Sequence, residues 1–163
     1  MNLDKYLIPA MESTSSNNMK EKINFFDKEW NVSVKFDKKV KEVMDKGKGQ
    51  IGGSGDAIMM TILKVVHNGA SISKSAEKKF CELCEKYNDD PEYTKMLKGS
   101  IKTYKDVKGL RLTSIYVTFH PWNSKNILVV LQGEYDIDPE HGWCMPIKNG
   151  QWTGELGQFS DYY

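Results

Sequence analysis

Three carboxylates and a histidine gather in one short segment near the end of the chain: Asp136, Asp138, Glu140 and His141. Oxygen donors at alternating positions suit a hard cation such as calcium, and the imidazole suits a transition metal. The twelve-residue register of an EF-hand is absent. We prefer a simpler interpretation, in which Asp138 bonds nearby backbone, Pro139 fixes φ and Gly142 permits an unusual dihedral angle. A metal site formed by the four polar residues is the alternative.

Two cysteines have the spacing of half a zinc site or of a redox pair, namely Cys81 and Cys84. No second pair of ligands with comparable spacing follows, because Cys144 and the three histidines are scattered single residues. Both cysteines fall within an amphipathic pattern that includes Phe80, and a free cysteine there behaves as a small apolar residue. We therefore predict core cysteines, with zinc binding and redox chemistry as alternatives.

A glycine-rich segment, residues 47–52 (GKGQIG), matches the spacing of a dinucleotide fingerprint. That fingerprint needs a strand before it and a helix start directly after it. Residues 38–46 instead have a charged, helical pattern, so we interpret the segment as a flexible loop. The enzymatic alternative is a cleft near this loop or a dyad of His120 and Cys144. We expect a protein that is not an enzyme, with no catalytic residue and no cofactor.

Aromatic side chains are the remaining candidates for a binding surface. Trp143 and Trp152 fall on opposite arms of a predicted terminal hairpin, and Asp161, Tyr162 and Tyr163 close the sequence. Aromatic residues are enriched at binding interfaces, although most tryptophans belong to cores. We predict these five residues as a partner-binding surface, with core packing as the alternative.

The predicted strands lie at the two ends of the chain. Residues 23–26 and 30–36 predict a hairpin with one buried face, since the second run alternates apolar and polar residues. Residues 113–119 also alternate, and residues 126–131 are apolar enough for a central strand. Asn149-Gly150 between two short apolar runs predicts the terminal hairpin, because both residues tolerate a positive φ.

Three helices are predicted between the two groups of strands. The first begins at Ser54 and ends at Asn68-Gly69; the second spans about residues 75–87. The third opens at Pro91 and fades before Gly109. The resulting order, ββ-ααα-ββββ, predicts an α+β fold in which about three helices pack on a mainly antiparallel sheet.

Length and charge set the class of protein. The 163 residues predict a single domain, residues 1–163, with a loosely ordered segment at residues 1–20. The 23 basic and 22 acidic residues nearly cancel, and Arg111 is the single arginine, which argues against a nucleic-acid partner. No apolar run is long enough to span a bilayer and no signal-peptide pattern opens the sequence, so no membrane partner is expected. Three cysteines favour reduced thiols and a cytoplasmic location.

Residues 138–142 (DPEHG) follow a Val/Leu-rich strand and precede Ile147-Lys148-Asn149-Gly150. This block resembles the C-terminal signature of a bacterial family of uncharacterised domains, over roughly residues 113–157. Relatives of this kind occur among the immunity proteins of polymorphic and contact-dependent toxin systems. The resemblance implies a small cytoplasmic α+β protein that binds a protein partner, a cognate toxin domain, and blocks it sterically. Such a function requires no catalytic group.

Overall fold

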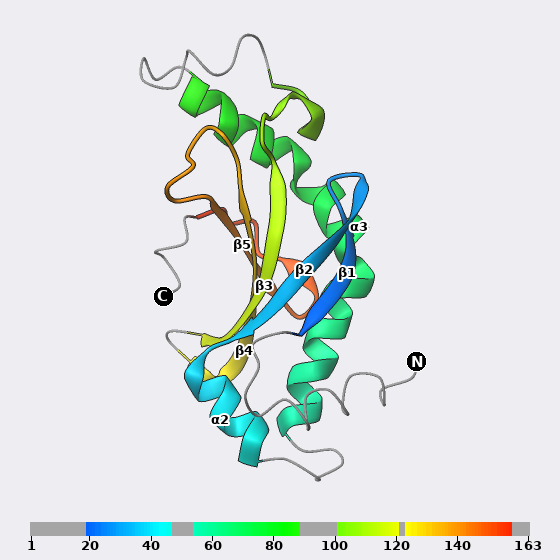
Figure 1. Ribbon diagram of the computed structural model, residues 1–163, viewed down its shortest axis with the longest axis vertical. Helices are drawn as coiled ribbons and strands as arrows, with labels where there is room; N and C mark the ends of the chain where they lie inside the picture. Colours follow the sequence, from blue (N-terminus) through cyan, green and yellow to red (C-terminus); the bar gives the residue numbers. More distant parts are fainter. Residues whose placement is uncertain (1–18, 47–53, 89–100, 121–122, 158–163) are drawn as a thin grey trace.

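The computed structural model describes residues 19–46, 54–88, 101–120 and 123–157. These residues form one six-stranded sheet and two α-helices (Figure 1). In chain order the elements are β1 (Lys20–Phe25), β2 (Lys28–Phe36), α2 (Lys38–Lys46), α3 (Ser54–Asn88), the 3-10 helix η1 (Tyr104–Asp106), β3 (Arg111–His120), β4 (Asn123–Glu134), β5 (Trp143–Lys148) and β6 (Gln151–Trp152).

The strands follow the order of the chain across the sheet, from β1 at one edge to β6 at the other. Every neighbouring pair is antiparallel except β2 and β3, which run parallel. The segment between those two strands includes α2 and α3, as a parallel crossover requires. The predicted α+β class with a mainly antiparallel sheet is therefore confirmed.

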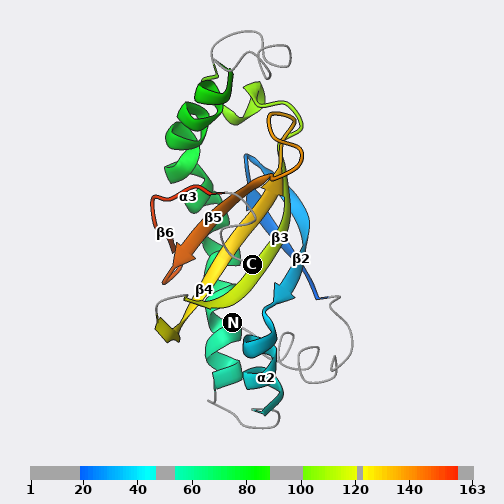
Figure 2. The same cartoon turned by 90° about the vertical axis from the view of Figure 1, so that its left-hand side faces the viewer.

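The main core lies between α3 and one face of the sheet (Figures 1 and 2). Ile115 and Val117 of β3 belong to it, together with Leu131 of β4 and Ile62 and Phe80 of α3. Side chains alternate between the two faces of a strand, so the intervening residues point to the opposite face. There a second, smaller apolar cluster consists of Tyr116, Leu128, Val130 and Cys144.

Both predicted hairpins are present. Asn149 and Gly150 have φ of 52° and 74°, which gives the left-handed turn that joins β5 to β6. In the first hairpin, Phe26 and Asp27 occupy the turn with φ of 50° and 61°. The turn therefore lies slightly earlier than the sequence pattern placed it, since Lys28 already pairs with Phe25 in the sheet.

The helices differ from the prediction, and so does the order ββ-ααα-ββββ. The first two predicted helices are one: α3 continues through Asn68 and Gly69 for 35 residues, or about 50 Å. Gly69 is buried against β1, where its missing side chain lets the helix approach closely. The charged segment after β2 forms α2.

Most of the third predicted helix lies outside the described residues, and from Ile101 to Gly109 the chain forms only the short turn η1. Residues 1–18 of the predicted loose segment also lie outside them, while Lys20 already belongs to β1. The glycine-rich loop at residues 47–52 is likewise not described. Neither of the two α-helices seen here combines the length and the apolar character needed to cross a membrane.

Candidate functional site

The acidic segment before β5 is a tight turn built on Asp138, a residue that is 4% exposed. One carboxylate oxygen of Asp138 accepts the His141 backbone N–H at 3.2 Å and lies 2.9 Å from His141 Nδ1. The Gly142 N–H donates to the Asp138 backbone oxygen at 3.0 Å, and Gly142 has φ of 59°. The turn interpretation is therefore confirmed, with Asp138 bonding nearby backbone and glycine at the left-handed position.

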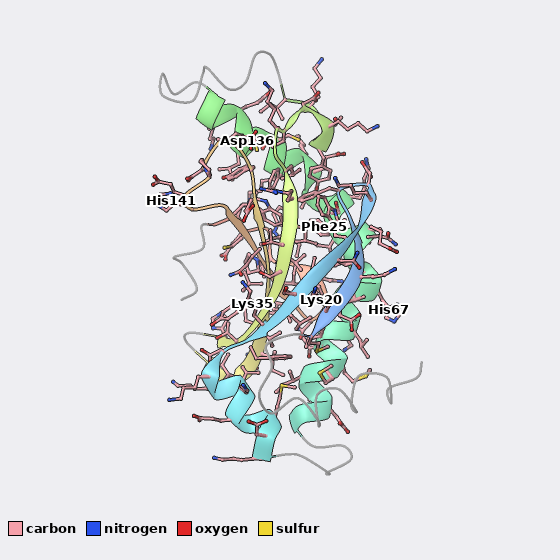
Figure 3. The ribbon with its side chains drawn as sticks, viewed as in Figure 1. Lys20, Phe25, Lys35, His67, Asp136 and His141 are labelled. Atoms are coloured by element: carbon pink, nitrogen blue, oxygen red, sulfur yellow. The ribbon has the colours of Figure 1, made fainter. Side chains whose placement is uncertain are left out.

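The four candidate metal ligands do not converge around one point. Asp136 is exposed and lies against Gly109, while its N–H donates to the Lys108 oxygen at 2.9 Å. Glu140 and His141 are also exposed, and Figure 3 shows His141 at the outer edge of the loop, apart from Asp136. Across the described ranges, no group of three or more His, Cys, Asp and Glu side chains could hold a metal ion. The geometry thus offers the metal alternative no support.

The two spaced cysteines are core residues, as predicted. Cys81 and Cys84 are 3% and 0% exposed and belong to the main apolar cluster. Burial raises the pKa of Cys81 to about 11, with a further contribution from the carboxylate of Glu77. Burial also raises the pKa of Cys84 well above its ordinary value. Both thiols therefore stay protonated near neutral pH, which disfavours zinc binding and thiolate chemistry.

The structure does not support the dyad of His120 and Cys144 that was part of the enzymatic alternative. Cys144 lies opposite Gln132, and Gln132 lies opposite Ser114. His120 ends the same strand as Ser114, about 20 Å further along at the usual rise of a strand. The two side chains are therefore too far apart to exchange a proton.

Trp143 is a core residue and not part of an accessible partner-binding surface, which corrects the prediction. Its side chain is fully buried, and its ring lies 5.2 Å from that of Phe26 and 5.5 Å from that of Phe80. A Cβ on Gly133 would lie 2.2 Å from the Trp143 ring, so β4 carries glycine where the indole lies. The indole fills the core at the start of β5 and helps to anchor that strand.

Trp152, in contrast, is half-buried at the edge of the sheet. Its indole N–H donates to the Glu155 backbone oxygen at 2.8 Å, and Lys79 Nζ lies 5.5 Å from the ring centre. Lys79 also donates to the backbone oxygen of Gly154, which ties α3 to the segment after β6. Asp161, Tyr162 and Tyr163, the other predicted partner-binding residues, lie outside the described residues.

A concavity of about 290 Å³ lies between α3 and the segment that follows β6. We call it the terminal groove. Trp152 is not among its lining residues, but it contacts two of them, since its indole N–H bonds to Glu155 and its ring lies near Lys79. Leu83 and Leu156 contribute apolar surface, and both signs of charge occur among its lining residues. The charged residues are Lys79, Glu82, Lys86 and Glu155.

A second concavity, of about 390 Å³, lies at the tip of the first hairpin, and we call it the hairpin pocket. The β1–β2 turn and the segment 104–111 form it together. Its apolar lining includes Phe26, Trp30, Tyr104, Val107 and Leu110; its charged lining is Asp27, Lys28, Lys105 and Arg111. No motif in the sequence singled out this pocket, because its two halves are far apart in the chain. The alternating pattern around Trp30 was the only local signal.

Comparisons with known proteins do not identify the chain. No family model matches it, and no curated protein or solved structure matches it.

Proposed function

We propose that this chain is a non-enzymatic protein-binding domain that acts as an immunity protein and neutralises a bacterial toxin by steric blockade. The terminal groove beside Trp152 is the observation that carries the proposal. The resemblance of residues 138–142 to a signature found among relatives of immunity proteins supports the choice of partner.

The environment of Trp152 suits a contact residue. The ring is partly exposed, and its hydrogen bond to the Glu155 oxygen holds the indole in one orientation before any partner arrives. An aromatic side chain that is already ordered loses little conformational entropy on binding, so more of its contact energy contributes to affinity. Trp152 is therefore the expected centre of the interface.

The surroundings of Trp152 have the arrangement of an interface. In the terminal groove, Leu83 and Leu156 provide apolar surface, while Lys79, Glu82 and Glu155 supply charges of both signs. Trp152 adjoins this groove through its contacts with Lys79 and Glu155. Interfaces commonly combine an apolar centre with a polar rim, and a mixed rim favours one complementary partner. A standard interface covers about 800 Å² on each partner, so the terminal groove and the adjacent Trp152 together would form its centre.

The turn at residues 138–142 contributes indirectly, by positioning this surface. It ends where β5 begins, and Ile147 of β5 lies opposite Trp152 of β6 in the sheet. The buried Asp138 and the left-handed Gly142 therefore hold the strand against which Trp152 is placed. Steric blockade requires only this preformed shape and charge, without a reacting group.

The test is a quantitative capture experiment with tagged protein in lysate of the source organism, read by mass spectrometry. We expect one stoichiometric partner whose toxicity is relieved by equimolar wild-type protein. Trp152→Ala should weaken that complex about 30-fold, since a central aromatic residue contributes about 2 kcal/mol. His67→Ala is the control, because His67 is exposed on the same helix, α3, and does not line the terminal groove.

Three results would overturn the proposal. The first is the absence of any stoichiometric partner, and the second is a partner that is not toxic. The third is a complex that Trp152→Ala leaves unchanged, because the terminal groove would then lie outside the interface. Circular dichroism of each variant establishes that the fold is retained.

A further inference from the structure

The hairpin pocket has a rigid floor. Phe26 sits in the turn with φ of 50°, a conformation that costs a residue with a side chain about 1 kcal/mol or more. Its N–H donates to the Ser73 hydroxyl at 2.8 Å, a buried bond to α3. Its ring meets Tyr104 at 4.5 Å and Trp30 at 6.4 Å, both edge to face. These contacts from several elements hold the strained turn in one conformation.

The floor is also fixed at its polar atoms. The Tyr104 hydroxyl donates to the Ser73 backbone oxygen, and the Trp30 indole N–H donates to the Phe25 oxygen at 2.7 Å. Burial raises the pKa of Tyr104, so the phenol remains a donor throughout the physiological range. The aromatic rings therefore present a preformed apolar surface whose polar atoms are already bonded within the protein.

The rim of the pocket is predominantly cationic. Lys28, Lys105 and Arg111 line it, against a single carboxylate, Asp27. Arg111 pairs with Glu134 at 2.8 Å. Lys28 and Lys105 form no ion pair with another described residue, and Lys28 Nζ lies 4.0 Å from the centre of the Trp30 ring. Two ammonium groups beside an aromatic floor are thus available to an anionic ligand.

We propose that the hairpin pocket binds an acidic segment of a protein partner. One aromatic or aliphatic side chain of that segment would lie on Phe26 and Trp30, and flanking carboxylates would meet Lys28 and Lys105. This site is separate from the terminal groove and does not depend on the proposed immunity function.

The shape of the pocket favours a peptide segment over an enclosed small molecule. Asp27, Lys28, Lys105 and Arg111 are all exposed, so the pocket is an open basin, whereas small-molecule sites cover most of their ligand. Its apolar floor and its single arginine also favour a peptide over a nucleic-acid strand, whose phosphates are commonly held by several arginines and lysines.

The experiment is a titration of isotope-labelled protein followed by the indole N–H resonances in NMR spectra. The probe is a blocked hexapeptide, Glu-Glu-Phe-Glu-Glu-Leu, and its matched control replaces each glutamate with lysine. We expect the acidic peptide to shift the Trp30 resonance, assigned with Trp30→Phe, and to leave that of Trp152 in place. The basic peptide should shift neither resonance.

Charge variants test the cationic rim. The double variant Lys28→Glu and Lys105→Glu should weaken acidic-peptide binding at least tenfold. The matched control, Lys64→Glu with Lys148→Glu, has the same net charge at exposed positions outside the pocket and should bind as wild type does. Asp27→Asn should tighten binding two- to threefold, because it removes the carboxylate from the lining and asparagine tolerates a positive φ.

The proposal is overturned by an unchanged Trp30 resonance at millimolar peptide, or by equal weakening in the two double variants. It is also overturned if an oligouridylate of similar length displaces the peptide at a lower concentration, which would make the site a nucleic-acid site. None of these results depends on Trp152 or on capture of a toxin. The peptide-binding proposal and the immunity function can therefore be refuted independently of each other.

Discussion

Replacing Gly69 with alanine should destabilise the protein, although the same change usually stabilises a helix. Gly69 lies inside α3, where alanine is favoured over glycine by about 1 kcal/mol. Here, however, an added Cβ would lie 2.5 Å from Ile23 Cγ1 and 2.6 Å from the backbone oxygen of Asn24. Both atoms belong to β1, and a backbone oxygen cannot rotate away as a side chain can. The helix and the strand would have to separate.

The magnitude follows from the size of that separation. An ordinary contact to the Asn24 oxygen requires the gap to open by roughly 0.8 Å. Overpacking of a tight interior costs about 1–3 kcal/mol, and a clash with backbone belongs at the upper end of that range. After the gain in helix propensity, the free energy of unfolding should fall by about 2 kcal/mol. For a chain of this size the melting temperature should fall by about 4–8 °C.

Urea unfolding followed by far-UV circular dichroism measures this change, and two variants of the same helix serve as controls. At Gly55 an added Cβ would meet nothing nearer than Met44 Cα at 4.0 Å, so Gly55→Ala should be neutral or stabilising. At exposed Ala70, substitution by glycine should cost about 1 kcal/mol through propensity alone. A Gly69→Ala protein as stable as wild type would refute the close approach of α3 to β1.

Three further predictions concern the core and the turn at residues 138–142. Replacing both Cys81 and Cys84 with alanine should lower stability by about 2 kcal/mol in urea unfolding and leave partner capture intact; unchanged stability with lost capture would contradict the core assignment. Gly142→Val should cost about 2 kcal/mol or more, because valine is strained at φ of 59°; a wild-type melting temperature would argue against it. Burial raises the pKa of Cys81 to about 11 in the folded protein, against 9.0 ordinarily. The contribution of this thiol to the free energy of unfolding is therefore present below pH 9 and is lost as the pH rises toward 11. Unfolding free energies measured across that window should fall less steeply in Cys81→Ala, and identical slopes would contradict the assignment.

Several features were predictable because their causes are local. Asn149-Gly150 forms a hairpin turn because these two residue types tolerate positive φ at little cost. Asp138 bonds to the backbone three residues later, which is a property of the short segment itself. Cys81 and Cys84 fall on the buried stripe of a helix whose periodicity is visible in the sequence. Each of these signals involves neighbours within about one helical turn or one β-turn.

The errors arose where distant packing overrides a local signal. Asn68-Gly69 has the composition of a helix stop, yet α3 continues because glycine lets it pack closely against β1. From the sequence, Trp143 could have been a surface residue or a core residue. It is a core residue because its indole fits into the space over Gly133 and among the other aromatic rings. Aromatic composition alone does not distinguish these environments.

The sequence by itself determined the α+β class, the two hairpins, the turn at Asp138 and the burial of Cys81 and Cys84. Only the tertiary structure decided that the two predicted helices are one, that β2 and β3 run parallel, and that the hairpin pocket exists. The reason is physical. Dihedral preferences and hydrophobic periodicity act between near neighbours, whereas a pocket is formed by segments that meet only when the core is buried.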